Sequence, residues 1–105
     1  MSAARTDRVF NALADPNRRQ IVEHLAAGGP ATATGLAGQL GVSRQGAAKH
    51  LGSLAEAGIV VATKEGREVR YELLGDGLEP GALWLEQVGG KWDRRLASLK
   101  RHLDE

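Results

Sequence analysis

The sequence predicts a mainly α-helical protein with one β-hairpin, and three observations support this prediction. Through most of residues 6–57, apolar residues recur at steps of three or four, the spacing of helices that are buried on one side. Between residues 59 and 74 the pattern changes to β-branched residues and alternation. Helical spacing returns after a linker at residues 75–81. The expected order is four helices, two strands and a fifth helix, the arrangement of a winged helix-turn-helix.

Two helices are expected at the start of the chain. The first covers residues 6–13 and places three apolar side chains on one side. Asp15 is suited to cap the second, and Pro16 to begin it, because proline lacks an N–H that would have no partner there. Glycines at 28 and 29 should end this second helix.

Residues 34–57 predict two crossing helices joined by a tight turn at Gly41. Thr32 or Thr34 can cap the first of them and Ser43 the second, each by accepting hydrogen bonds from free amides of the first turn. Gly58 should then stop the second helix in a left-handed conformation. Such a helix pair is typical of a unit that reads duplex DNA.

The candidate base contacts lie in the first turns of the second crossing helix. A cap at Ser43 leaves Arg44, Gln45, Ala48 and Lys49 pointing outward. Arginine suits the edge of guanine and glutamine that of adenine, while Lys49 suits a phosphate or a base edge. Ser43 can contact a phosphate as well as cap the helix. The alternative is ordinary polar surface at a helix start.

Two positions in the same helix leave alternatives open. His50 suits either a contact with phosphate or a packing or capping role inside the protein. Gly46 weakens the helix. Its presence is explained either by close approach of the backbone to a base or by neutral drift.

The expected hairpin turns around Gly66 and carries cations near its tip. Lys64 and Arg67 are candidates for contacts with the DNA backbone, and Arg70 is a third; the alternative for all three is solvated charge. The net charge of +1 does not by itself identify a nucleic-acid binder. The prediction of DNA binding therefore depends on where the charges lie. Residues 43–70 contain five cations and three carboxylates.

The last expected helix, residues 83–103, has one apolar stripe along its length. Gly89 and Gly90 weaken it, so either a partner packs there or the helix kinks. A second subunit would cover the stripe; the alternative is packing on the protein's own core. Trp84 and Trp92 suit this interface, or else a small apolar pocket.

Size and composition indicate a single domain over residues 1–105, located in the cytoplasm, with no membrane partner. The chain has no cysteine, which excludes disulfides and thiolate metal ligands. Its first residues lack the apolar segment of a secretory signal. No catalytic constellation is found, so we expect no enzyme activity and no cofactor.

The segment 12–73 resembles the ArsR/SmtB family of bacterial repressors, in the branch without an obvious metal site. The similarity rests on DPNRR at a helix start, SRQGAAKHL in the reading helix, EAGIV at the junction and EGREVRY in the hairpin, in that order. Each motif is weak alone. Their order and spacing make the resemblance specific.

The resemblance implies a homodimer that binds an inverted repeat in double-stranded DNA and represses transcription by excluding polymerase. Its reading helices would enter successive major grooves, and its first and last helices would form the interface. The interface residues expected are Val9, Phe10, Leu13, Leu85, Val88, Trp92, Leu96, Leu99 and Leu103.

Metal control fits the residues poorly, and no metal site is expected. His102 and Glu105 resemble half of the family's zinc site between subunits, but Gly89 and Lys91 stand where its Asp and His would lie. A metal-responsive repressor stays an alternative, as does a protein-interaction module that barely touches DNA. The sequence identifies no effector ligand.

Overall fold

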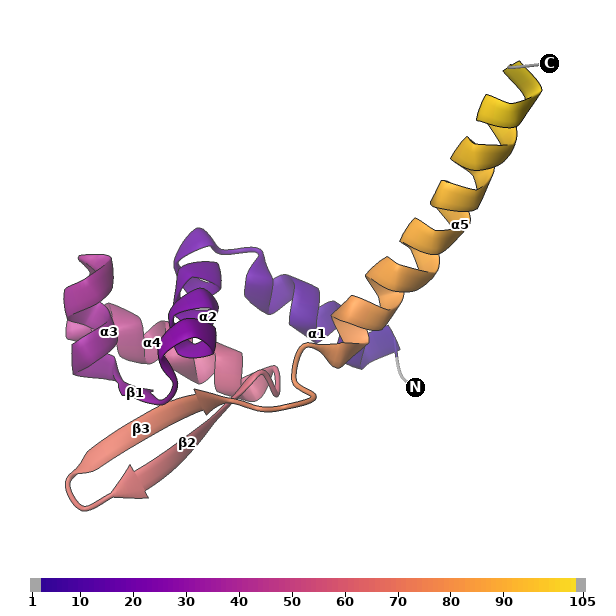
Figure 1. Cartoon of the computed structure of the whole chain (residues 1–105). Helices are drawn as coiled ribbons and strands as arrows, with labels where there is room; N and C mark the ends of the chain where they lie inside the picture. The colour runs from indigo at the N-terminus through magenta and orange to yellow at the C-terminus, as the bar shows by residue number, and fades with distance from the viewer. Residues whose placement is uncertain (1–2, 104–105) are drawn as a thin grey trace.

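The computed structural model describes residues 3–103 as five helices and a small sheet (Figure 1). It confirms the expected four helices, hairpin and final helix, and adds one short strand before the third helix. The elements are α1 (Ala3–Leu13), α2 (Pro16–Gly28), β1 (Ala31–Thr32), α3 (Ala33–Leu40), α4 (Arg44–Glu56), β2 (Val60–Glu65), β3 (Glu68–Leu73) and α5 (Glu79–Leu103).

Side-chain caps begin three of the helices, as the sequence predicts. The Asp15 carboxylate accepts hydrogen bonds from the Asn17 amide at 2.8 Å and the Arg18 amide at 3.2 Å. Thr32, rather than Thr34, caps α3 by accepting from the Gly35 amide at 3.1 Å. These bonds satisfy amides of the first turn that have no partner within the helix.

A left-handed glycine follows each helix of the α3–α4 unit. Gly41 has φ +69° and donates its amide hydrogen bond to Ala37 O at 3.0 Å, which ends α3 and allows α4 to cross it. Gly58, with φ +78°, follows α4 and turns the chain into β2. Both positions require a positive φ, which residues with a Cβ rarely adopt.

The hairpin pairs β2 with β3 from Val60 opposite Leu73 to Glu65 opposite Glu68. Its turn falls at Gly66, with φ +62°, as predicted. The additional strand β1 pairs with β3, which therefore lies in the middle of a three-stranded sheet. Two residues are too few to show alternation, so the sequence pattern could not reveal β1. These residues form a strand only because they pair with β3, which is distant in the sequence.

The core lies between α1, α2, α3, α4 and the start of the hairpin. Val9 belongs to this core at 2% exposure, so its expected place in a dimer interface is wrong. The other two apolar residues of α1, Phe10 and Leu13, are only partly buried. The largest fully buried side chains are Ile21, Leu36, Leu51, Leu54, Ile59 and Val60.

The terminal helices are both longer than expected. α1 begins at Ala3 rather than at residue 6, and α5 begins at Glu79 rather than at residue 83. Pro80 is accepted in the first turn of α5 because the amides there have no partner within the helix. The expected linker over 75–81 is correspondingly shorter.

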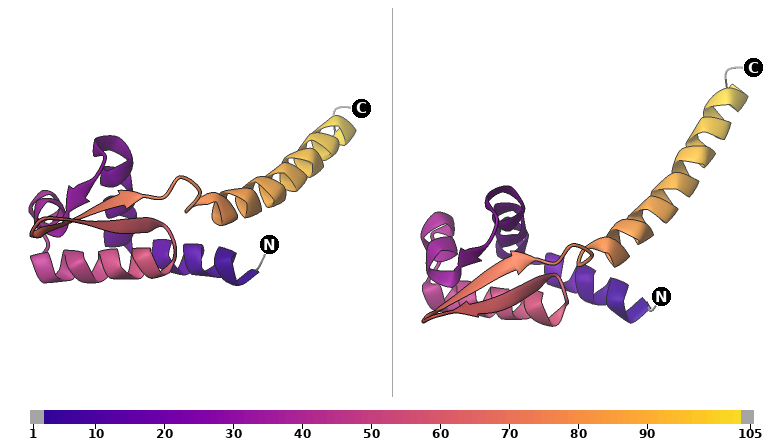
Figure 2. Two further views of the ribbon diagram at one scale, coloured as in Figure 1. Left: turned by 90° about the horizontal axis from the view of Figure 1, so that it is seen from below. Right: turned by 60° about the horizontal axis from the view of Figure 1, so that its bottom comes forward.

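Only the first turns of α5 pack on the rest of the chain, where they meet α1. Beyond them the helix leaves the body of the molecule (Figures 1 and 2). It continues through Gly89 and Gly90 without interruption. The alternative in which its apolar stripe packs on the protein's own core is therefore wrong.

None of the helices in the described residues is both long and apolar enough to cross a membrane.

Candidate nucleic-acid interface

The first two turns of α4 expose the residues that the sequence singles out. Ser43 Oγ accepts a hydrogen bond from the Gly46 amide at 2.9 Å, which fixes the start of the helix. Arg44, Gln45, Ala48 and Lys49 are exposed. Ala47, Leu51 and Leu54 face the core. Packing of these three side chains sets the rotation of α4, so its polar edge faces outward.

A hollow of about 470 Å³ separates this edge of α4 from the wing formed by β2 and β3. Arg44, Gln45 and Ala48 line one side of it, and Arg67 and Tyr71 line the other. Thr34, from the first turn of α3, also lines it. The structure therefore brings the tip of the wing and the reading edge of α4 to one concave surface.

Sequence reasoning missed Thr34 and Tyr71 as lining residues. Thr34 was weighed only as a helix cap, a role that Thr32 takes, and its hydroxyl is left exposed at the hollow. Tyr71 lies on the same face of β3 as Val69, and both line the hollow. The sequence predicted the alternation of the hairpin but not which of its faces turns toward α4.

The wing cations differ in their surroundings. Lys64 pairs across the hairpin with Val69, and both lie on the face that also carries Tyr71. Lys64 and Arg67 are exposed. In contrast, the Arg70 guanidinium lies on the opposite face, 3.2 Å from the Glu65 carboxylate and 3.4 Å from that of Glu68. Two exposed carboxylates offset the charge of Arg70, which distinguishes it from Lys64 and Arg67, and its contact with DNA stays a prediction.

His50 is half-buried on α4, and its charge acts on the Asp15 carboxyl that caps α2. Desolvation raises the pKa of Asp15, but amide hydrogen bonds from Arg18 and Asn17 and the positive charges of His50 and Arg18 outweigh it and hold that pKa below 3.8. Half-burial of His50 fits the packing alternative, and its contact with phosphate stays a prediction.

Gly46 has a local structural neighbour. A Cβ at this position would lie 3.0 Å from Ser43 Oγ, so the cap would have to shift by a few tenths of an ångström. Glycine leaves the capping oxygen its space. This contact offers a third explanation beside the two considered from the sequence.

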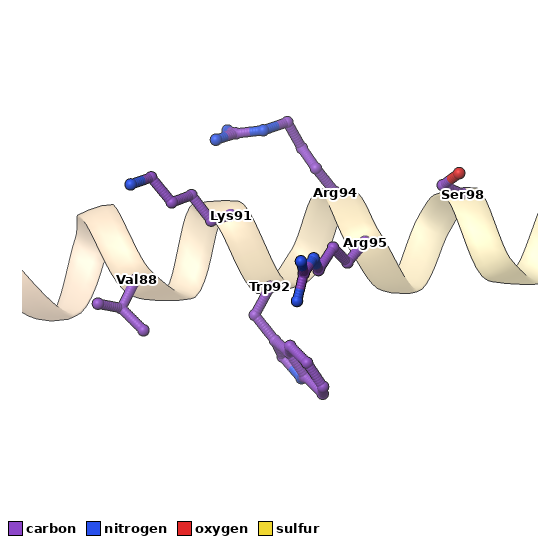
Figure 3. Close-up of a pocket in the computed structure, with 6 residues that line it drawn as sticks. All are labelled: Val88, Lys91, Trp92, Arg94, Arg95 and Ser98. Carbon is purple, nitrogen blue, oxygen red and sulfur yellow. The ribbon is translucent and has the colours of Figure 1, made fainter.

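The expected interface residues of α5 form an uncovered stripe. Leu85, Val88, Trp92, Leu96, Leu99 and Leu103 are between 45% and 74% exposed. Trp84 packs edge-on against Phe10, with ring centroids 5.5 Å apart, and so joins α5 to α1. Further along, a hollow of about 650 Å³ is lined by side chains of α5 alone, with no second element opposite (Figure 3).

Residues 3–103 contain no group of three or more His, Asp and Glu side chains that could hold a metal ion. His102 is exposed at the end of α5, and Glu105 lies outside the described residues.

Comparison with known proteins places these features in a family. The helix-turn-helix domain family matches residues 13–62. The HTH-type transcriptional regulator CmtR of Mycobacterium tuberculosis is 46% identical over 66 residues, which are 63% of this chain and 55% of that protein. The chain thus spans about half the length of that curated relative.

Two solved structures match over most of both chains. An ArsR-like transcriptional regulator from Rhodococcus is 44% identical with a TM-score of 0.75, covering 94% of this chain and 92% of that one. The homodimeric winged helix-turn-helix DNA-binding domain Mb0332 of Mycobacterium bovis, described as a possible ArsR-family regulator, is 31% identical with a TM-score of 0.69, covering 85% and 81%. With this agreement in sequence and fold, the chain belongs to the ArsR/SmtB family of winged helix-turn-helix transcriptional regulators.

Proposed function

We propose that this protein is a homodimeric, sequence-specific regulator that binds double-stranded DNA and represses transcription. One observation carries the proposal: the exposed edge of α4 and the exposed Arg67 of the wing face one hollow. A convex duplex fits such a surface, with α4 in the major groove and the wing on the flanking backbone. The proposal treats the chain as one DNA-binding domain that acts in the cytoplasm and has no catalytic role.

The residues divide into those that read bases and those that position the protein. Arg44 is the candidate for a bidentate contact with guanine, and Gln45 for one with adenine. Ala48 suits a thymine methyl group. Phosphate contacts fall to Ser43 and Lys49 on α4 and to Lys64 and Arg67 on the wing.

A second copy of the chain is the proposed occupant of the α5 stripe. An isolated helix gains too little from propensity alone to project into water, so packing must stabilise α5. The homodimeric state of the Mb0332 domain supports this arrangement. A two-fold dimer would present two α4 edges about one turn of DNA apart, and so would read an inverted repeat. Occupying such a site in a promoter would exclude polymerase.

An electrophoretic mobility shift assay tests the proposal. With the duplex upstream of the protein's own gene, the full chain should form a discrete complex that random duplex of equal length does not displace at physiological salt. Equal affinity for both duplexes would contradict sequence-specific binding.

The exposed stripe of α5 also favours a second candidate, a module whose last helix binds a different protein. Light scattering of the purified chain separates the two. A dimer supports the proposed repressor, whereas a monomer at assay concentrations supports the interaction module.

A further inference from the structure

A cationic groove runs between α1 and the C-terminal end of α4, remote from the reading edge. Two adjoining hollows form it, of about 360 Å³ and 220 Å³, and they share Arg8, Glu56 and Ala57. Figure 2 shows α1 continuing along the same side of the molecule as α4. We call this feature the α1–α4 groove; its polar lining is Arg5, Arg8, Asn11, Arg18, Ser53 and Glu56.

The charges of the α1–α4 groove are unbalanced. Three guanidinium groups face one carboxylate, that of Glu56. Both ion pairs in the described part of the chain belong to Arg70 on the wing, so none of the three groove arginines has a carboxylate within 4.0 Å. Arg8 donates to Ala4 O through Nε alone, which leaves its terminal nitrogens available. The lining of the groove therefore has a net positive charge.

Arg18 gives the strongest indication of an occupant. Its Nε is shielded from solvent and has no hydrogen-bond acceptor. A buried donor without a partner is rare and needs a reason, because it has given up its bond to water. Arg18 also lines the larger hollow, where a carboxylate or phosphate would suit the planar fork of its guanidinium.

The neighbouring polar groups are compatible with such a ligand. Ser53 donates its hydroxyl proton to Lys49 O at 3.3 Å, so the groove arginines remain the principal donors. The Asn11 side chain adds an amide at the rim of the larger hollow. A volume of 360 Å³ lies at the lower end of the range for small-molecule sites.

Arg8 and Phe10 lie on different sides of α1. Phe10, which meets Trp84 at the start of the α5 stripe, is two residues from Arg8 and so lies about 160° around α1 from it. A second copy seated on the stripe would cover the Phe10 side. The groove lies on the other side.

We propose that the α1–α4 groove binds a small anion through its carboxylate or phosphate oxygens, with Arg18 and Arg8 as the principal ligands. The site joins α1, which carries Phe10, to the last turns of α4, whose first turns carry Arg44. An occupant would therefore influence both dimer contacts and DNA reading, a consequence that rests on the proposed function. The binding itself does not.

Isothermal titration calorimetry of the full chain, without DNA, tests the site. The probes are inorganic phosphate and succinate, added at constant ionic strength. Saturable binding is expected, weakened at least tenfold in Arg18→Gln and unchanged in Arg101→Gln, which removes an exposed cation from the far end of α5. Equal weakening in both variants would show a general charge effect and overturn the proposal.

Glu56→Gln provides a second test with the opposite sign. Removing the one carboxylate that faces the groove should tighten binding several-fold, a gain that a folding defect cannot produce. No saturable heat with either probe overturns the proposal. If Arg18→Gln weakens duplex binding while leaving phosphate and succinate binding unchanged, the groove contacts the DNA backbone and the proposal is also wrong. Because the titrations contain no DNA, failure of the proposed repressor function leaves their outcome unaffected.

Discussion

At the residue scale, the wing contains two arginines with different electrostatic surroundings. Arg67 is exposed at the hollow, whereas Arg70 is paired with Glu65 and Glu68 on the other face. Their chemistry is the same in the sequence. Only the register of the hairpin shows that one guanidinium is free to contact phosphate and the other is already neutralised.

Arg67→Ala should weaken binding to every duplex and reduce the slope of log affinity against log salt by about 1, because one phosphate contact is lost. Arg70→Ala is the matched control and should leave that slope unchanged. Fluorescence anisotropy over a series of salt concentrations measures both. Equal slopes for the two variants would contradict the assignment.

Arg44→Ala should remove preference for one base pair while leaving binding to random duplex nearly intact. The loss of a bidentate contact with guanine corresponds to about 1–3 kcal/mol of discrimination, roughly 5- to 150-fold. Competition between operator and single-substituted duplexes measures it. A uniform loss over all duplexes would instead assign Arg44 to phosphate.

The lowered pKa of Asp15 predicts that the stability of the fold depends on pH. Its pKa is held below 3.8 in the folded protein, so the ionised carboxylate stabilises the fold above 3.8 and this contribution is lost as the pH falls through the folded-state pKa. Asp15→Asn keeps a good cap but lacks the charge. At neutral pH this variant should have a lower free energy of unfolding than the wild type, and the difference should shrink at strongly acidic pH. Urea denaturation at several pH values measures it.

The exposed Glu23→Gln on the same helix serves as the control for that experiment. A deficit for Asp15→Asn that stays constant over the whole pH range would refute the role of the Asp15 charge.

At the scale of elements, the helices and hairpin were predictable because their signals are local. Asp15, Thr32 and Ser43 act through bonds to amides two or three residues away, and Gly41 and Gly66 act through their own φ. The strand β1 was not predictable, because two residues carry no period and pairing with β3 alone makes it a strand. The burial of Val9 in the core was not predicted either. A dimer interface and a core both require an apolar face, so the sequence pattern of α1 does not distinguish them.

The connection between β3 and α5 depends on a close backbone approach. A Cβ at Gly77 would lie 2.8 Å from Gly58 O and 2.9 Å from Ile59 Cα. Backbone atoms at that junction cannot move aside as a flexible side chain does. This contact fixes where α5 departs relative to the end of α4.

Gly77→Ala should therefore lower the free energy of unfolding by about 1–3 kcal/mol, the range for overpacking. Gly75→Ala is the control, since nothing lies within 4 Å of a Cβ there. Urea denaturation followed by circular dichroism measures both. Similar stabilities for the two variants would show that the junction relaxes without strain.

At the scale of the whole molecule, the shape is extended. The Cα radius of gyration is 17.8 Å, against about 13 Å for a compact chain of this length. The excess comes from α5, whose 25 residues would span roughly 37 Å. The sequence predicted the apolar stripe but could not show that the chain itself leaves it uncovered, because that depends on the direction in which α5 departs.

Leu96→Asp together with Leu99→Asp should convert the proposed dimer into a monomer, because two charges would be buried without partners in the seam. Light scattering gives the mass, and circular dichroism shows whether the rest of the fold persists. Ala97→Asp, on a different side of α5, is the control. A double variant that stays dimeric would exclude the stripe as the seam.

The protruding α5 has a consequence for the cell if a second copy covers it, as we propose. While subunits are scarce compared with their dissociation constant, the number of assembled pairs rises with the square of the number of chains synthesised. Halving synthesis would then reduce operator-competent pairs about fourfold. A promoter controlled by this protein would respond steeply to gene dosage, with no inducer required.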